Sequence, residues 1–305
     1  MRITTLHSNE LQAAGVSVDI VRLDQIDQQL GGNKWFKLLP FLRAARCQGQ
    51  RTLVSFGGAY SNHIGALAAA GARYGFATVG LVRGELVIPL NPVLRFAATC
   101  GMTLYPVSRT DYRRKHEAGF TERFCNQIGL GTDVAIIPEG GAALSGVVGC
   151  QKLADLVWPH LTASSAPCEV ILPCGTGTTA AGLIAGLHRQ AQRAPSAAPI
   201  EVRGVAVLKG GDFLRSDIAT WLGRQGVTDC VVPWHVDVDF HGGGYARVSP
   251  ELQAFVDDFF HQHGVPLEPV YSGKLLWAVM QRIRQGCYAP GTRIVVLHTG
   301  GIWPH

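Results

Sequence analysis

The chain has 305 residues, of which 47% are hydrophobic and only 16% are charged. Because an average soluble domain has about 25% charged residues, this composition excludes a disordered chain and indicates a well-buried globular protein of two domains or one large one. The net charge of +5 comes from 27 basic and 22 acidic residues spread along the chain, and no basic run is longer than Arg113, Arg114 and Lys115. We therefore expect neither nucleic acid nor membrane as a partner, whereas a small anionic ligand suits the charge.

Cysteine spacing and hydropathy narrow the class further. The eight cysteines include no Cys-x-x-Cys pair, which excludes zinc ribbons and thioredoxin-like redox motifs and predicts no metal site. The first residues, MRITTLHSNEL, lack the apolar segment of a secretory signal. The longest uncharged stretches, 52–72 and 170–188, are interrupted by polar residues that a lipid-facing span would not place at its centre. We expect a cytoplasmic protein with free thiols.

Short β-branched runs alternate with longer helical stretches along the chain. The first half predicts strands at 51–56, 77–82 and 102–107, each followed by a helix, at 61–75, 91–101 and 111–129. The second half predicts strands at 133–138, 169–174, 202–208 and 293–298, with helices at 144–161, after Thr179 and at 212–224. Near-continuous apolar strands separated by helices predict an α/β fold of parallel sheets covered on both faces.

A glycine-rich turn follows the strand at 169–174 and opens a helix of small residues. Its sequence is Gly175, Thr176, Gly177, Thr178 and Thr179. Such a turn lets several backbone N–H groups point at one anion, and the helix N-terminus adds positive charge. A dinucleotide site of an NAD-dependent reductase is an alternative, but it needs an acidic residue at the end of the next strand, where this chain has Lys209. The two adjacent hydroxyls favour a phosphate monoester, and a purely structural turn is the other alternative.

A lysine beside aromatic residues marks the stretch GGNKWFKL. Gly31 and Gly32 open a turn, and Lys34 precedes Trp35 and Phe36. Lys34 could be an ordinary surface cation. Together with a phosphate loop, however, an apolar setting that lowers the amine pKa is what a Schiff base with an aldehyde cofactor requires.

Two further sets of polar residues follow predicted turns. Ser61, Asn62 and His63 begin the helix at 61–75, where they form either a plain helix cap or a receptor for a substrate carboxylate. Tyr245 and Tyr271 follow glycine-rich and proline-bounded turns. Each is either a packed amphipathic ring or an acid or base beside a cofactor.

Six motifs occur in order between Gly31 and Gly301: GGNKWFKL, the SNH turn, PEGGAALSGVVG, CGTGTT, EPVYSGK and LHTGG. Together they resemble the pyridoxal 5'-phosphate (PLP) enzymes of the tryptophan-synthase-beta type, fold type II. More narrowly, they resemble the family of 1-aminocyclopropane-1-carboxylate (ACC) deaminase and D-cysteine desulfhydrase. The resemblance implies a homodimer with a three-layer αβα fold. A large PLP-binding domain (1–36 plus 147–305) would carry a small inserted α/β domain (37–146).

The resemblance also implies roles for the site residues. Lys34 would carry PLP as a Schiff base and remove the Cα proton of a small amino-acid substrate, Asn62 would bind the 3-hydroxyl of the cofactor, and Ser61 would hold the substrate carboxylate. Tyr245 and Tyr271 would lie near Cα and the leaving group. The remaining cofactor contacts would come from Gly175, Thr176, Gly177, Thr178 and Thr179 at the phosphate, Ser272 at the pyridine nitrogen, and Thr299.

Three departures from the family pattern bear on activity. Tyr60 replaces the usual Gln before the SNH turn and Ile-Gly-Ala follows it in place of Thr-Arg-Gln, which alters carboxylate recognition; the tail GIWPH is shorter than usual, which alters one pocket wall. Ser272 stands where the deaminases have Glu and the desulfhydrases Thr. A hydroxyl leaves the pyridine nitrogen largely neutral, which favours elimination of a good leaving group over opening a cyclopropane ring.

The sequence therefore predicts a PLP-dependent lyase or deaminase. The expected reaction is α,β-elimination from a D-cysteine-like substrate to a keto acid, ammonia and sulfide, with ACC deamination as the nearer alternative. An NAD-dependent reductase and a catalytically inactive PLP-binding homologue are the alternatives from other classes.

Overall fold

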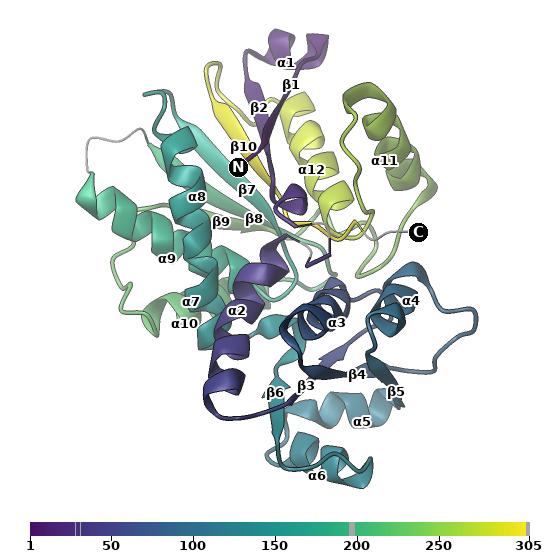
Figure 1. The fold of residues 1–305 in the computed structure, drawn as a ribbon. Helices are drawn as coiled ribbons and strands as arrows, with labels where there is room; N and C mark the ends of the chain where they lie inside the picture. The colour runs from purple at the N-terminus through teal and green to yellow at the C-terminus, as the bar shows by residue number, and fades with distance from the viewer. Residues whose placement is uncertain (28, 31, 195–198, 303–305) are drawn as a thin grey trace.

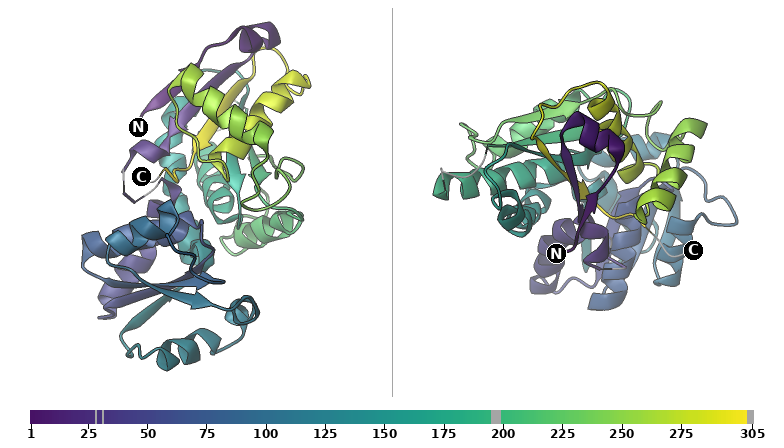
Figure 2. Two further views of the ribbon diagram at one scale, coloured as in Figure 1. Left: turned by 90° about the vertical axis from the view of Figure 1, so that its right-hand side faces the viewer. Right: turned by 90° about the horizontal axis from the view of Figure 1, so that it is seen from above.

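The computed structural model describes residues 1–27, 29–30, 32–194 and 199–302, so Gly31 and the last three residues of the tail lie outside it. Its strands form two sheets, one of six strands in the order β1-β2-β10-β7-β8-β9 and one of four in the order β5-β4-β3-β6. Figure 1 shows the larger sheet in the upper half of the molecule and the smaller one below it. The left view of Figure 2 shows the same two halves from the side.

The larger sheet has helices on both faces. Its strands are β1 (Ile3–Leu6), β2 (Ser17–Arg22), β7 (Cys168–Cys174), β8 (Ile200–Ala206), β9 (Trp234–Asp237) and β10 (Arg293–His298). The core on one face includes α7 (Leu144–Cys150), α8 (Lys152–Leu161), α9 (Thr178–Arg193) and α10 (Phe213–Gly223). The core on the other includes α1 (Asn9–Ala14), α11 (Pro250–His263) and α12 (Ser272–Arg284). All strand pairs are parallel except β1 with β2.

The smaller sheet is wholly parallel and is also covered on both faces. Its strands are β3 (Thr52–Gly57), β4 (Ala77–Arg83), β5 (Thr103–Val107) and β6 (Val134–Ile137). On one face lie α2 (Asn33–Cys47), α3 (Asn62–Tyr74) and α4 (Pro92–Thr99); on the other lie α5 (Arg109–Arg113) and α6 (Phe120–Gln127). Single 3₁₀ turns complete the chain at η1 (Leu23–Gln25), η2 (Arg114–His116) and η3 (Glu139–Gly141).

The predicted α/β fold with parallel sheets is confirmed, and the finer differences have local causes. The helix expected at 111–129 is broken, because Glu117 is extended and Gly119 has a φ of +68°. The helix expected at 144–161 is divided at Gln151, whose N–H bonds the carbonyl of Val148, three residues back. The strands β1, β2 and β9 and the helices α1, α11 and α12 were not predicted.

The division into two domains stays a proposal, and the buried side chains support it. The two cores of the smaller sheet use residues between Leu30 and Ile137. The two cores of the larger sheet use residues up to Phe36 and from Val147 onward. Helix α2 joins the halves, since Phe36 packs on the larger sheet while Leu38 packs on the smaller one.

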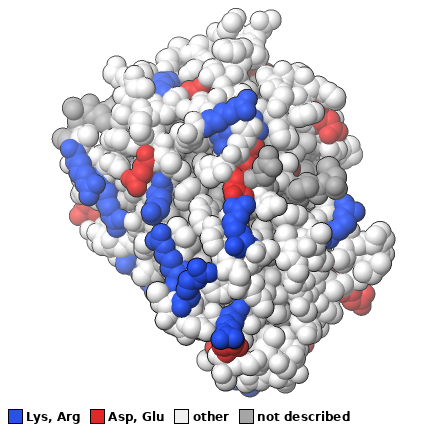
Figure 3. Space-filling model, in the orientation of Figure 1, with Lys and Arg blue, Asp and Glu red and all other residues white. Residues whose placement is uncertain are grey.

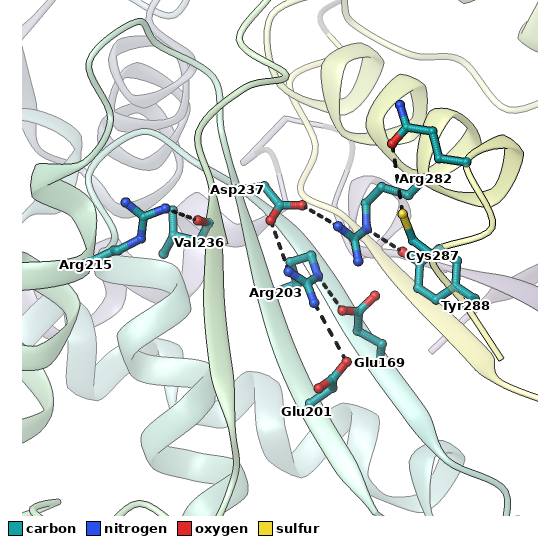
Figure 4. Close-up of polar contacts among 10 residues, drawn as sticks. Glu169, Glu201, Arg203, Arg215, Val236, Asp237, Arg282, Cys287 and Tyr288 are labelled. Carbon is teal, nitrogen blue, oxygen red and sulfur yellow. Dashed lines mark hydrogen bonds and ion pairs between the residues drawn. The ribbon is translucent and has the colours of Figure 1, made fainter.

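A buried ion-pair network ties the strands of the larger sheet to α12 (Figure 4). The Arg203 guanidinium pairs with Glu169 and, at 3.0 Å, with Asp237. Arg282 lies 3.1 Å from the other oxygen of Asp237 and donates to the Tyr288 hydroxyl at 3.1 Å. Without Arg203 on β8, the carboxylates of Glu169 on β7 and Asp237 on β9 would lose a positively charged partner.

The surface charge is scattered. On the face in Figure 3, basic side chains form small separate groups between uncharged residues, with a few acidic ones among them. Within the described part of the chain, every helix is too short or too polar to cross a bilayer.

Candidate active site

A cavity of about 300 Å³ lies where the carboxyl ends of strands from both sheets meet. In parallel α/β sheets this edge is the usual place for a ligand site. The turns after β3, β4 and β6 supply the wall from the smaller sheet, and those after β7 and β10 supply the wall from the larger one. Of the predicted site residues, nine line it: Lys34, Ser61, Gly175, Thr176, Gly177, Thr179, Tyr245, Tyr271 and Thr299.

Lys34 lies in the first turn of α2 and is connected to the glycine-rich loop. Its Nζ donates to Asn33 Oδ1 at 3.1 Å, and Asn33 Nδ2 donates to Thr179 Oγ1 at 2.8 Å. The backbone N–H of Asn33 bonds the carbonyl of Thr299 at 3.2 Å, which fixes the start of the helix against the end of β10. Asn33 therefore positions the lysine, a role that the sequence reasoning missed although Asn33 belongs to the GGNK motif.

The surroundings of Lys34 favour its neutral form. Burial, with the nearby positive charge of Lys37, lowers the pKa of Lys34 to about 7. Near neutral pH much of this amine is therefore unprotonated, which is the form that attacks an aldehyde. The prediction of a desolvated lysine agrees with this setting.

The loop from Gly175 to Thr179 has the shape of an anion cradle. Gly177 has a φ of +66°, and a Cβ there would lie 2.9 Å from Ile218 Cγ1, so the turn requires glycine. A Cβ on Gly175 would lie 3.3 Å from the Tyr271 hydroxyl and would narrow the cavity. The first N–H groups of the 16-residue helix α9 follow. Thr178 is fully buried, does not line the cavity and bonds Thr176 Oγ1 at 2.9 Å, so it shapes the loop from behind.

A second buried lysine lines the cavity beside this loop. Lys37 is 4% exposed, and its Nζ donates to the carbonyl of Gly140 at 3.2 Å. Among the described residues no carboxylate lies within 4.0 Å of this ammonium. A buried positive charge of this kind calls for an anion, and a phosphate in the loop would supply it. The sequence indicates this position of Lys37 by its spacing from Lys34, since residues three apart lie on the same face of a helix.

His63 lines the cavity and carries a buried hydrogen-bond acceptor. Its Nε2 lies 2.9 Å from Ser55 Oγ, and that hydroxyl donates to the carbonyl of Ile137 at 2.7 Å. Because the Ser55 proton is already used, His63 must donate from Nε2, and its Nδ1 carries the lone pair. Burial and the two lysines lower the pKa of His63 to about 3, so the ring is neutral. Nδ1 is buried with no partner among the described residues, so it leaves one acceptor unsatisfied beside the cavity.

The residues around His63 hold the start of α3. Ser61 caps this helix by accepting the N–H of Ile64 at 3.4 Å, and it lines the cavity together with Gly58. Asn62 does not line the cavity, and its amide lies so close to Gly301 that a Cβ there would overlap it. The role of Asn62 at the cofactor 3-hydroxyl stays a prediction.

Two tyrosines form the opposite wall. The Tyr271 hydroxyl donates to that of Tyr245 at 3.5 Å, and the rings meet edge to face with centroids 6.1 Å apart. Lys34 Nζ lies 5.7 Å from the centroid of the Tyr271 ring. Burial raises the pKa of both tyrosines, so both hydroxyls are protonated hydrogen-bond donors at neutral pH.

A carboxylate that the sequence reasoning missed fixes Tyr271. Glu268 accepts the backbone N–H groups of Val270, Tyr271 and Ser272 at 2.9, 2.5 and 2.8 Å. Ser272 is fully buried and does not line the cavity; its hydroxyl accepts the N–H of Glu268 at 2.9 Å and donates to the carbonyl of Glu268 at 3.2 Å. Its predicted contact with the pyridine nitrogen therefore stays a prediction.

These features fit PLP. The cradle, the unpaired Lys37 and the largely neutral amine of Lys34 match its phosphate and its aldehyde, and the His63 acceptor offers a further contact. Among the described residues no group of three or more His, Cys, Asp or Glu side chains is placed to hold a metal ion.

Comparison with known proteins identifies the family. The chain is 29% identical over 289 residues to a putative ACC deaminase of Thermotoga maritima, covering 93% of this chain and 88% of the relative. It is 26% identical over 290 residues to the D-cysteine desulfhydrase of Klebsiella pneumoniae, covering 94% and 87%. The crystal structure of an ACC deaminase homologue superposes with a TM-score of 0.81 at 23% identity, over 99% of this chain and 89% of that one. Finally, the model of the pyridoxal-phosphate dependent enzyme family matches residues 5–300, and this chain therefore belongs to that family.

Proposed function

We propose that this protein is a PLP-dependent lyase that eliminates a β-substituent from a small amino acid, most simply D-cysteine. The cofactor, when bound, withdraws electrons from the substrate Cα. The observation that carries the proposal is the pairing of Lys34, whose pKa is about 7, with the neutral tyrosine pair across the same cavity. A base near pH 7 and a hydroxyl donor are what an elimination at Cα and Cβ needs.

The position of each cavity residue suggests its role in the reaction. A lysine whose pKa lies near the working pH both takes and releases a proton readily, so Lys34 is suited to move the Cα proton. Ser61 and the start of α3 face the cavity where a substrate carboxylate would be held. Tyr245, kept protonated by burial, donates a hydrogen bond to the departing group, and Tyr271 positions it by donating to its hydroxyl.

One feature supports elimination over opening of a cyclopropane ring. Among the described residues, Glu139 is the one carboxylate that lines the cavity. It is already engaged, since it accepts the Tyr112 hydroxyl at 2.7 Å and lies 3.3 Å from Lys115 Nζ. A pyridine nitrogen without a carboxylate partner stays largely neutral, so the reaction depends on a group that leaves easily. ACC deamination is the second candidate because relatives from Pyrococcus horikoshii and Thermotoga maritima are named putative ACC deaminases.

The test is turnover by the purified holoenzyme. We expect D-cysteine or β-chloroalanine to yield keto acid and ammonia, with sulfide from D-cysteine, while ACC yields no 2-oxobutanoate. Lys34→Ala should abolish turnover. Release of 2-oxobutanoate from ACC would establish the second candidate, and a yellow holoenzyme inert towards D- and L-amino acids would indicate the inactive homologue. The NAD-dependent reductase is set aside, because the family match covers residues 5–300.

We further propose a cytoplasmic homodimer, on the strength of the family resemblance alone. Sedimentation velocity of the holoenzyme should give the mass of two chains, and a monomer at micromolar concentration would contradict it.

A further inference from the structure

An arginine at the mouth of the cavity has no acidic partner. Arg83 ends β4, is exposed and lines the cavity. Its guanidinium lies over the Tyr112 ring, 5.7 Å from the centroid. Among the described residues no carboxylate lies within 4.0 Å of it, and the nearby Glu139 is bonded to Tyr112 and Lys115 instead. The guanidinium therefore remains available to an anion that enters the cavity.

The position of Arg83 places it beyond the reacting end of the site. Lys34 lies 5.7 Å from the Tyr271 ring, and Tyr271 bonds Tyr245 at 3.5 Å. Burial raises the pKa of Tyr245, and the positive charge of Arg83 acts in the opposite direction, so the two side chains are close enough to interact. Contacts thus connect Lys34, Tyr271 and Tyr245, and Arg83 lines the same cavity at its exposed edge.

This order separates two parts of an amino-acid substrate. Because the α-carboxylate is one bond from Cα, it must stay near Lys34 and the start of α3. A side chain that extends from Cα along the tyrosines reaches towards the exposed guanidinium. The tip of Arg83 also lies beside the turn before α3, since a Cβ on Gly58 would be 3.8 Å from Nη2, so this wall has little bulk to block a charged group.

We propose that Arg83 is a specificity-determining residue that binds a negatively charged β-substituent of the substrate, so that this enzyme prefers amino acids whose side chain ends in a thiolate, sulfonate, phosphate or carboxylate. The inference deepens the proposed function by naming its substrate class. The binding it predicts is read from the first spectral change on mixing, before elimination proceeds.

Stopped-flow titration of the holoenzyme tests it, with the amplitude of the first change in the visible absorbance of the bound cofactor as the readout. The ligands are cysteate and serine, each as D and L enantiomers, because they share every group except the β-sulfonate and β-hydroxyl. Wild-type protein should bind cysteate more tightly than serine, and added salt should weaken cysteate binding selectively. Arg83→Gln should weaken cysteate binding roughly tenfold, as expected for an exposed charge-assisted contact, and should leave serine binding within about twofold.

Two further variants make the result specific. Arg83→Lys keeps the charge and should retain part of the preference for cysteate. Arg95→Gln removes an exposed arginine of α4 that does not line the cavity, and both affinities should stay unchanged. If Arg83→Gln loses affinity for cysteate and serine equally, Arg83 binds the α-carboxylate that both ligands share. If neither affinity changes, Arg83 has no binding role. Either result overturns the proposal. The proposed function is tested by a separate measurement: if it is wrong, no β-substituted substrate yields a keto acid.

Discussion

Replacing Lys37 by methionine tests how the cavity holds its cofactor. Methionine keeps much of the length and apolar volume but removes a buried ammonium that is bonded to one carbonyl. If that charge faces the phosphate, its loss removes a charge-assisted contact of about 1.5 to 3 kcal/mol, which is roughly a 10- to 100-fold weaker dissociation constant for PLP. Pyridoxal, which lacks the phosphate, should bind the variant and the wild type within about threefold of each other.

The same substitution should change the titration of Lys34. In the wild type the rate of cofactor attachment should rise with pH through about 7, because the folded pKa lies below the ordinary value of 10.5 and the neutral amine is the reactive form. Removing the positive charge of Lys37 leaves burial as the main cause of the lowered pKa, so the midpoint should move to higher pH. The dissociation constants and the pH midpoint of cofactor attachment are both measured from the change in cofactor absorbance on mixing with apoprotein.

Lys274→Met is the matched control. This lysine is also fully buried, donates to the carbonyls of Val207 and Gly244 at 3.1 and 2.7 Å, and does not line the cavity. Its loss should lower stability without changing the ratio of PLP to pyridoxal affinity. The reasoning about Lys37 is refuted if its variant loses affinity for PLP and pyridoxal equally, or if the pH midpoint of cofactor attachment stays at about 7.

Three other substitutions or treatments test separate parts of the structure. Borohydride reduction and peptide mapping should place the pyridoxyl group on Lys34, and finding it on another lysine would refute the assignment. The double variant Thr178→Ala, Thr179→Ala removes one hydroxyl that lines the cavity, that of Thr179, and one that supports the loop, so it should weaken PLP binding by roughly one to two powers of ten; unchanged affinity would make the loop a purely structural turn. Arg203→Ala leaves the buried Glu169 carboxylate unpaired (Figure 4), so denaturant unfolding should show a loss of about 3 to 5 kcal/mol, and a loss below about 1 kcal/mol would mean that the network relaxes around the gap.

The parts of the site that could be predicted are those that depend on residues consecutive in the sequence. The turn from Gly175 to Thr179 needs glycine at a positive φ and opens a helix, and both requirements appear in the sequence itself. Lys34 could likewise be singled out by the glycines and aromatic residues around it. Strands such as β7 and β10 were predictable for the same reason, because burial on both faces makes them continuously apolar.

Other features depend on contacts between segments far apart in the chain. The tautomer of His63 is set by Ser55 on β3 and by the carbonyl of Ile137 on β6. Glu268 gains its role by bonding three amides at the start of α12. A local pattern of residues contains neither arrangement. The antiparallel pairing of β1 with β2 is a similar case, since the short half-exposed run at Ile3–Leu6 has little apolar signal of its own.

The charges around the cavity connect cofactor binding with catalysis. Lys34 and Lys37 lie on one helix turn with no carboxylate within ion-pair distance among the described residues. Burial lowers the pKa of Lys34 most and the charge of Lys37 lowers it further, which keeps Lys34 reactive. The charge of Lys37, which has no carboxylate beside it, would attract a phosphate. A phosphate held beside Lys37 would reduce the repulsion on Lys34 and would make that amine a stronger base for the Cα proton. Arg83 lies at the mouth of the cavity, away from Lys34, Lys37 and the phosphate loop. Its positive charge therefore persists with the cofactor bound and can select among anionic substrates.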